Sequence, residues 1–372
     1  MHRGFKIFGA LILIAYLALH LQQHVNFPRL KQLKGAFTET SYPEFSWEAW
    51  FKGNWQDQFE KYQKDHLGYR PNLTRLHHQI HYSFFDEIFH NDIHFGKNKN
   101  LMGGEYLEAY RGENFIGDSA IEARAQALGI LHQKMQDSNK LFLVVLAPDK
   151  AYSRPQDFNL PPEVTKPNNS ESWRSALKKV GIPFLDFRSH FAEMEDTSSY
   201  PLFPKTGIHW SIWGMHYAMD SIAGFIEANS NIAMPRRVLD GVRWSTDYPA
   251  IETDMEDALN LWLELPKEEL AYPNYHMEGD STKPKVLIIS DSFFYEMYSS
   301  GLANQYFDAP FFWYYNLRAL KYDWLEAPAN PNHYKMDSIV EAHDVILMMS
   351  ASSNLKDFPW AFDSRVKKEL IP

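Results

Sequence analysis

Cysteine is absent from this chain of 372 residues. Its absence excludes disulfide bonds, thiolate metal sites and a cysteine nucleophile. A lipoprotein anchor is excluded as well, because that lipid is attached to a cysteine. The chain also lacks an excess of positive charge, since its formal net charge is −10. A general nucleic-acid-binding protein usually has a basic excess, so we expect no nucleic-acid partner.

Long apolar runs are scarce, and one near the N-terminus stands out. The segment Ile7–Leu21 is almost entirely apolar, and Arg3 and Lys6 precede it. Its length suits a signal-peptide core or a short signal anchor. No Ala-x-Ala cleavage pattern follows, so we expect residues 1–24 to be an uncleaved membrane anchor; the alternative is a cleaved signal peptide. The basic flank places the domain on the periplasmic or exterior side, either anchored or released into the periplasm.

The rest of the chain is rich in core-forming residues, because 45% of the sequence is hydrophobic and 15% aromatic. Residues 25–115 are predicted to form a membrane-proximal helical and tether region, since aromatic residues recur at near-helical spacing in Phe45–Arg70 and Arg75–Phe89. His77 and His81 share one helix face there. No third ligand follows at a suitable spacing, so we expect neither a metal nor an organic cofactor.

Strands alternate with helices in the predicted main domain, residues 116–372. Five short apolar runs are typical of buried strands: Leu141–Leu146, Phe184–Phe187, Val286–Ile289, Phe311–Tyr315 and Val345–Met349. Helical spacing separates them, as in Ala123–Met135, Ser172–Val180 and Ile212–Ala228. This alternation predicts an α/β three-layer sandwich with a largely parallel sheet, interrupted by a loop-rich insertion at about 229–284.

A candidate nucleophile follows one of these strands. The strand ending at Ser290 breaks at Asp291, and a helical pattern resumes from Phe293, so Ser292 lies in a sharp strand-to-helix turn. Helix N-terminal N–H groups at such a turn could stabilise an oxyanion. We therefore predict that Ser292 is the nucleophile and that Ser290 and Phe293 contribute to oxyanion or substrate binding. The alternative is a serine that only caps the helix.

A candidate base lies in the segment Lys205–Gly214. A serine hydroxyl is a poor nucleophile at neutral pH and needs an adjacent base. His209 is the predicted base, and the alternative is a histidine packed between Trp210 and Trp213. A carboxylate normally holds such a histidine in the required tautomer.

These segments resemble the SGNH-hydrolase-like domains of the alginate O-acetyltransferase family (AlgJ/AlgX). That family has a Thr-Asp-x-His-Trp segment and, later, a strand that ends in Gly-Asp-Ser-Phe. The corresponding segments here are Thr206–Trp210 and Ser290–Phe293, with histidine before serine as in the family. The family's Asp is replaced by Gly207, so this relative lacks the expected triad acid.

The resemblance leaves the orienting acid unassigned. Asp186 and Asp254 are candidates by their position in the chain alone. Restoring the family residue by Gly207→Asp is expected to be neutral or to increase activity. Lys150 and Asn316 also follow predicted strands, so we expect them to bind substrate or the oxyanion. For Lys150 the alternatives are a side chain that orients the site and a solvated loop lysine.

The resemblance implies an activity. We expect O-acyl transfer, with acetyl as the acyl group, to a cell-envelope polysaccharide through an acyl-serine intermediate. A membrane-bound O-acyltransferase would be the partner that supplies the acyl group. Two alternatives remain open: a catalytically impaired protein that binds polysaccharide or a membrane partner, and a carbohydrate esterase.

Overall fold

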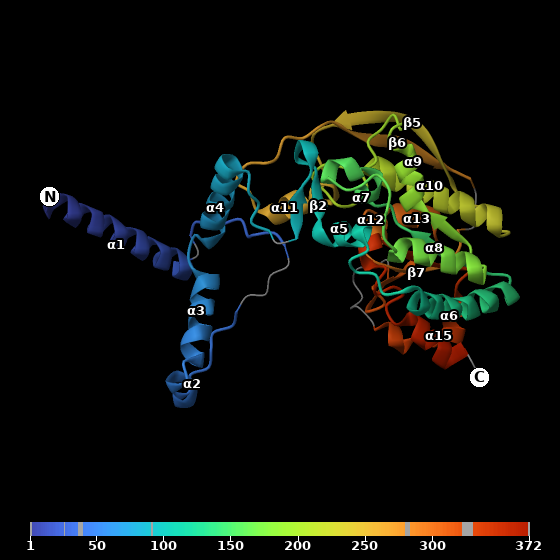
Figure 1. The fold of residues 1–372 in the computed structure, drawn as a ribbon, viewed down its shortest axis with the longest axis horizontal. Helices are drawn as coiled ribbons and strands as arrows, with labels where there is room; N and C mark the ends of the chain where they lie inside the picture. The colour runs from blue at the N-terminus through green and yellow to red at the C-terminus, as the bar shows by residue number, and fades with distance from the viewer. Residues whose placement is uncertain are drawn as a thin grey trace. The chain divides into compact units, whose positions relative to one another are not determined.

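The computed structural model describes residues 2–25, 27–35, 40–90, 92–279, 283–321 and 330–370. The chain forms two compact units. Unit 1 contains Met1–Asn91 and Glu256–Pro266, and unit 2 contains Asp92–Met255 and Lys267–Pro372. Figure 1 traces both units along the chain.

The core of unit 2 is a six-stranded sheet with the strand order β4-β3-β10-β7-β8-β9. Its strands are β3 (Leu141–Leu146), β4 (Phe184–Asp186), β7 (Val286–Ser290), β8 (Phe311–Tyr314), β9 (Arg318–Leu320) and β10 (Val345–Ser350). All neighbours are parallel except β8 and β9. The predicted, largely parallel sheet is therefore confirmed, and the antiparallel edge strand β9 is an addition to it.

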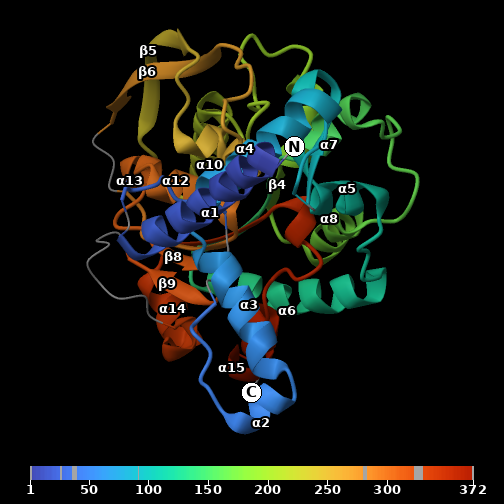
Figure 2. The same cartoon turned by 90° about the vertical axis from the view of Figure 1, so that its left-hand side faces the viewer.

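Both faces of the sheet are buried, because alternate side chains of β3 enter two separate cores. One face packs against α5 (Gly104–Arg111), α9 (Phe187–Met194), α10 (Ile212–Asn229), α12 (Ser292–Ser299) and α13 (Leu302–Tyr306). The other packs against α6 (Asp118–Asp137), α8 (Asn169–Val180), α14 (Met336–Ala342) and α15 (Phe362–Leu370). In Figure 2 the strands β8 and β9 lie between α10, α12 and α13 above and α6, α14 and α15 below. The predicted three-layer sandwich is thus present.

Unit 2 begins earlier than residue 116, where the sequence pattern suggested the start of the domain. The antiparallel pair β1 (Ile93–Phe95) and β2 (Leu101–Gly103) opens it. Helix α5 follows and buries Tyr106, Leu107 and Tyr110 in the same core as the sheet. Shorter helices of unit 2 are α7 (Lys150–Ser153), η1 (Lys97–Lys99), η2 (Pro155–Phe158), η4 (Pro331–His333) and η5 (Ser352–Asn354).

The predicted insertion at 229–284 has regular structure. Its strands β5 (Arg236–Ser245) and β6 (Leu270–Glu278) form an antiparallel ribbon. Between them lie η3 (Ala250–Glu252) and α11 (Asp254–Leu259). Many of the ribbon's side chains are exposed, so it lacks the continuous apolar runs that identify buried strands.

Unit 1 contains α1 (His2–Val25), α2 (Trp47–Phe51), α3 (Asn54–His66) and α4 (Arg70–Phe85). The segment Lys6–Val25 is long and apolar enough to cross a membrane, by length and composition, although signal sequences near an N-terminus share these properties. On α4 the His77 and His81 rings lie against each other and against Phe89. Within the described residues, no group of three or more His, Asp or Glu side chains is placed to hold a metal ion.

Candidate active site

Ser292 is the first residue of α12, directly after a turn that its neighbour Asp291 holds in place. The Asp291 carboxylate is completely buried and accepts hydrogen bonds from the N–H groups of Phe293 (3.1 Å) and Ala351 (2.7 Å). It also accepts one from the Asn354 amide at 2.9 Å. Burial raises the pKa of Asp291, whereas these donors lower it. Asp291 therefore fixes the turn that presents Ser292 at the carboxyl end of the sheet.

His209 lies between Ser292 and a carboxylate. Its Nε2 is 2.9 Å from the Ser292 hydroxyl, and its Nδ1 is 2.7 Å from Oδ2 of Asp254. Because the carboxylate can only accept, Nδ1–H donates to Asp254 and Nε2 is left to accept the serine proton. This is the tautomer that a general base requires. The His209 ring is 6% exposed and packs edge-on against Phe293.

Asp254 reaches the histidine because its segment is bonded to the histidine loop at several points. The Ile208 N–H donates to Asp254 Oδ1 at 3.0 Å, and the Thr206 hydroxyl donates to the Glu252 carbonyl at 2.6 Å. The Glu252 side chain is fully buried and accepts the Ile212 N–H at 2.8 Å. These contacts join the insertion to both ends of the loop that carries His209.

Gly207 makes room for this acid. A Cβ atom at position 207 would lie 2.9 Å from Asp254 Oδ1 and 3.1 Å from the Glu252 carbonyl oxygen. The first contact is shorter than real Cβ atoms show, so a side chain at 207 requires the Asp254 carboxylate to shift. The geometry therefore leads us to expect that Gly207→Asp reduces activity, in place of the neutral or beneficial effect expected from the family pattern.

Asp186, the other candidate acid, serves a different purpose. It caps the N-terminus of α9, accepting the Ser189 N–H at 3.1 Å and the Ser189 hydroxyl at 2.7 Å. It also forms an ion pair with Arg174 at 3.4 Å. Asp186 ends β4, which β3 and β10 separate from β7 in the sheet, so it is not the orienting acid.

Lys150 is a buried support for the histidine loop. It is 1% exposed, and its ammonium group donates to the carbonyl oxygens of Leu101 (2.8 Å), Pro204 (2.9 Å) and Gly207 (2.5 Å). A fourth acceptor is Oδ1 of Asn100 at 3.1 Å. Burial lowers the pKa of Lys150 to about 7. Neither the substrate-binding prediction nor the solvated-loop alternative fits a side chain enclosed in this way.

The other predicted oxyanion and substrate contacts are also corrected. The Ser290 side chain is completely buried within β7. The Phe293 N–H already donates to Asp291. Asn316 is 8% exposed and its amide donates to the Trp360 carbonyl at 2.9 Å. Strand ends identified these positions, but a strand end does not show whether the side chain is buried or already bonded within the protein.

Tyr315 and Glu296 were absent from the predicted site and lie beside it. The Tyr315 phenol is within hydrogen-bonding reach of Ser292 and Asn354, and burial raises its pKa, which keeps the hydroxyl protonated. Glu296 lies one helical turn after Ser292 on α12; burial raises the pKa of Glu296 and the charge of His209 opposes this. The four-residue spacing from the nucleophile was the available sequence signal for Glu296.

Comparison with known proteins finds a family match within unit 2. Residues 104–248 match the family model of the SGNH hydrolase-like domain of the acetyltransferase AlgX. This part of the chain is therefore similar to that domain. This match extends from α5 through β5 and includes His209, and unit 2 has the α/β fold with a mostly parallel sheet that the resemblance implied.

Solved structures give more distant similarities. The O-acetyltransferase domain of Pseudomonas putida AlgJ is 12% identical with a TM-score of 0.45, over 74% of this chain and 98% of that one. Bacillus cereus PatB1 is 14% identical with a TM-score of 0.42, over 71% and 96% of the two chains. Pseudomonas aeruginosa AlgX is 12% identical with a TM-score of 0.45, over 72% and 66%. No curated protein matches the chain.

The pH dependence of Ser292 acylation should report on the Asp254–His209 pair. Burial alone lowers the pKa of His209, but the charge and hydrogen bond of Asp254 raise it above its ordinary value. Only neutral imidazole accepts the serine proton, so the rate with p-nitrophenyl acetate should rise with pH, with a midpoint above about 6.5. In Asp254→Asn the midpoint should move to lower pH and the plateau rate should fall by about four orders of magnitude.

Asp186→Asn is the matched control for that measurement, because it removes a carboxylate that contacts α9 and not His209. It should leave the pH midpoint unchanged. If Asp254→Asn kept the wild-type midpoint, Asp254 would not set the protonation of the base.

Replacing Lys150 should loosen the histidine loop. In Lys150→Met three buried carbonyl oxygens lose their donor, and each unsatisfied group costs about 1–3 kcal/mol. We expect a clear fall in the denaturation temperature together with loss of acylation. Lys205→Met is the control on the same loop, because its partly exposed ion pair with Glu268 contributes at most about 1 kcal/mol. Equal losses in the two variants would contradict the supporting role of Lys150.

Proposed function

We propose that this protein transfers O-acetyl groups to a cell-envelope polysaccharide through an acyl-serine intermediate. The observation that carries the proposal is the hydrogen-bonded series Asp254–His209–Ser292. His209 lies within residues 104–248, which match the AlgX acetyltransferase model, and Asp254 and Ser292 follow that range. Its geometry is that of an activated nucleophile: a serine bonded to a base that a carboxylate orients.

The proposed reaction has two displacements. In the first, Ser292 Oγ attacks the acyl carbonyl carbon while His209 Nε2 takes the hydroxyl proton. The tetrahedral intermediate expels the donor's leaving group, which receives that proton from His209, and acyl-serine remains. In the second, a sugar hydroxyl gives its proton to His209 and attacks the acyl-serine. Ser292 is expelled and regains the proton, so the enzyme returns to its starting state.

Two donors are assigned to the oxyanion of each tetrahedral intermediate. The Ser292 N–H opens α12, where the helix dipole favours negative charge. The Tyr315 hydroxyl lies within reach of Ser292, and its raised pKa keeps it a neutral donor. A positioned donor of this kind typically contributes about a hundredfold or more to turnover. These two groups take the role that the sequence pattern gave to Ser290, Phe293, Lys150 and Asn316.

The hydrogen bond from His209 to Asp254 favours the catalytic alternative over a binding-only protein. The impaired alternative rested on the missing acid at position 207. An esterase would use the same acyl-serine and differ only in that water attacks it. The AlgX family match is the observation that favours a sugar hydroxyl.

The proposal includes a place and a partner. Helix α1 is taken as a retained anchor, with unit 2 on the periplasmic or exterior side of the cytoplasmic membrane. An acyl donor made in the cytoplasm must cross that membrane, so a membrane-bound O-acyltransferase is the proposed supplier. Neither step calls for a metal or an organic cofactor, because the serine, base, acid and oxyanion donors are all side-chain or backbone groups.

The acyl-serine intermediate is directly testable. After incubation with p-nitrophenyl acetate, the peptide that contains Ser292 should carry one added acetyl mass. Ser292→Ala should abolish the label, and His209→Ala should slow labelling by at least about a hundredfold, the usual effect of losing a general base. In cells, Ser292→Ala should eliminate O-acetylation of the polymer. Polymer acetylation that persists in the Ser292→Ala strain would refute the transferase proposal.

Variants that place an acid at position 207, with and without Asp254, should distinguish the steric effect of a side chain there from the effect of the carboxylate. Gly207→Asp alone should reduce acylation, because the new Cβ meets Asp254 and two carboxylates then compete for one histidine. Asp254→Ala alone should be strongly impaired. The double variant Gly207→Asp/Asp254→Ala should exceed both single variants, because one carboxylate can then reach His209 without the close contact with Asp254.

Gly207→Ala completes this series as a control, since it adds the Cβ without a charge. It should lose activity through displacement of Asp254 and should not gain from removal of that acid. A fully active Gly207→Asp enzyme would show that position 207 tolerates a side chain and that Asp254 moves without consequence.

A further inference from the structure

The helices α2, α3 and α4 of unit 1 have almost no buried surface of their own. Helices α2 and α3 bury no residue, and α4 buries only Arg75. Outside α1, nearly all exposed large hydrophobic side chains among the described residues belong to unit 1; those of unit 2 are Leu239, Trp244 and Leu317. The surface of a water-soluble protein rarely concentrates apolar side chains in this way. This exposure indicates that an apolar partner or phase covers these helices.

One side of α4 is fixed by polar contacts within unit 1. The Arg75 guanidinium donates to the carbonyl oxygens of Lys31 (2.8 Å) and Gln32 (2.7 Å). His78 Nδ1 bonds to the Leu259 carbonyl at 2.8 Å. Gln79 adds bonds to the chain near Trp262 on the same side of the helix. These contacts set the rotation of α4 about its own axis.

The opposite side of α4 is an apolar stripe. Leu73, Leu76, Ile80 and Phe84 follow each other at intervals of three and four residues, which places them on one helix face away from Arg75. They are 45%, 49%, 42% and 78% exposed. The helix thus turns its polar side inward and its apolar side outward, the reverse of a helix on a water-soluble domain.

Aromatic residues around α2 form a second exposed apolar group in unit 1. Phe45, Trp47, Trp50 and Phe51 are 52%, 68%, 39% and 82% exposed. Trp is enriched at the level of lipid headgroups, where its ring meets apolar chains on one side and water on the other. Phe and Trp also occur on the buried apolar face of helices that lie in the membrane interface.

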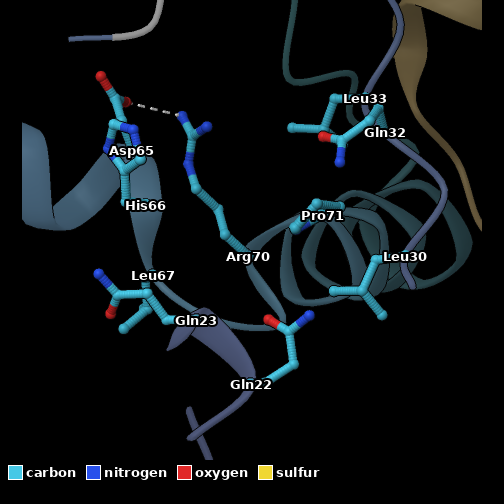
Figure 3. A pocket seen from close by; sticks show the side chains of 10 residues that line it. All are labelled: Gln22, Gln23, Leu30, Gln32, Leu33, Asp65, His66, Leu67, Arg70 and Pro71. Carbon is cyan, nitrogen blue, oxygen red and sulfur yellow. Dashed lines mark ion pairs between the residues drawn. The ribbon is translucent and has the colours of Figure 1, made fainter. Parts of the chain in front are cut away.

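The end of α1 is joined to the corner between α3 and α4. A Cβ atom at Gly68 would lie 1.9 Å from the Leu19 carbonyl oxygen, so this corner packs directly on the α1 backbone. The Tyr69 N–H donates to the Gln22 side chain at 3.0 Å. Gln22 and Gln23 line a pocket together with Asp65, His66, Leu67, Arg70 and Pro71, as Figure 3 shows. In Figures 1 and 2, α3 and α4 leave this joint in opposite directions.

We propose that unit 1 is a membrane-surface arm, in which the α4 stripe and the aromatic residues around α2 insert into the headgroup region of the outer leaflet. The lipid bilayer is the occupant because α1, joined to the corner between these helices, brings them to the membrane surface. The proposal goes beyond acyl transfer and rests on α1 being a retained anchor.

Fluorescent probes at single cysteines test the arm, since the native chain contains no cysteine to compete for the label. The full chain is labelled with an environment-sensitive dye at Leu76→Cys or Phe84→Cys. It is then reconstituted into phosphatidylethanolamine–phosphatidylglycerol vesicles that carry a spin label near the headgroup. Both probes should shift to shorter emission wavelengths and lose most of their intensity. High salt should not reverse this, because the insertion is hydrophobic.

Two probes calibrate the result. Leu13→Cys on α1 should also be quenched, by lipids labelled deeper in the chain, which shows that the anchor is inserted. Leu239→Cys on β5 is the matched negative control, because Leu239 is exposed to a similar extent (46%) but belongs to unit 2. It should keep its emission.

The outcomes separate the arm from the anchor. If the Leu13 probe is quenched while the Leu76 and Phe84 probes behave like the Leu239 probe, the arm is refuted. Shielding of Leu76 and Phe84 only when a membrane-bound protein is added also refutes it, in favour of a protein-docking face. If the protein fails to sediment with vesicles, the anchor is wrong and the arm falls with it, while acyl transfer by unit 2 is unaffected.

Discussion

The hydrogen bond between Asp254 and His209 is the interaction on which the site depends. It fixes the tautomer of a buried histidine whose other nitrogen faces Ser292. The acid comes from 45 residues further along the chain, so its position depends on how the insertion packs on the histidine loop. The Thr206 hydroxyl and the Lys150 ammonium group hold that loop from two sides. The chemistry at Ser292 thus depends on contacts far from the nucleophile itself.

The space beside Gly207 determines which residue can supply the carboxylate to His209. The AlgX-type pattern has an acid two residues before the histidine, and here Gly207 occupies that position while Asp254 fills the adjacent volume. A Cβ atom at 207 would lie 2.9 Å from Asp254 Oδ1, so a side chain there requires the Asp254 carboxylate to shift. A missing motif residue therefore does not by itself indicate lost chemistry. A carboxylate from another segment can take the same role when a glycine leaves space for it.

Local pattern predicted the sheet and the Ser292 turn well, because buried parallel strands are continuous apolar runs and a strand-to-helix turn is a local event. The sequence offered Asp254 only as one of two candidate acids for His209. The choice between them depends on tertiary packing, because the buried Glu252 bonds the segment of η3 and α11 to the histidine loop. Lys150 illustrates the opposite failure. A lysine after a strand suggests a solvated or substrate-binding side chain, and no local signal reveals that four oxygens from two other segments enclose it.

The two units also differ in what stabilises them. Unit 2 buries both faces of its sheet in apolar cores, so its large apolar side chains are removed from water within the unit itself. In α4, Leu73, Leu76, Ile80 and Phe84 remain exposed, and a large apolar side chain gains about 1.5–3 kcal/mol when fully removed from water. Even partial insertion of four such side chains exceeds the few tenths of a kcal/mol that surface pairs contribute along a helix. Insertion into the bilayer, reached through α1, would therefore stabilise unit 1 in the way that its apolar cores stabilise unit 2.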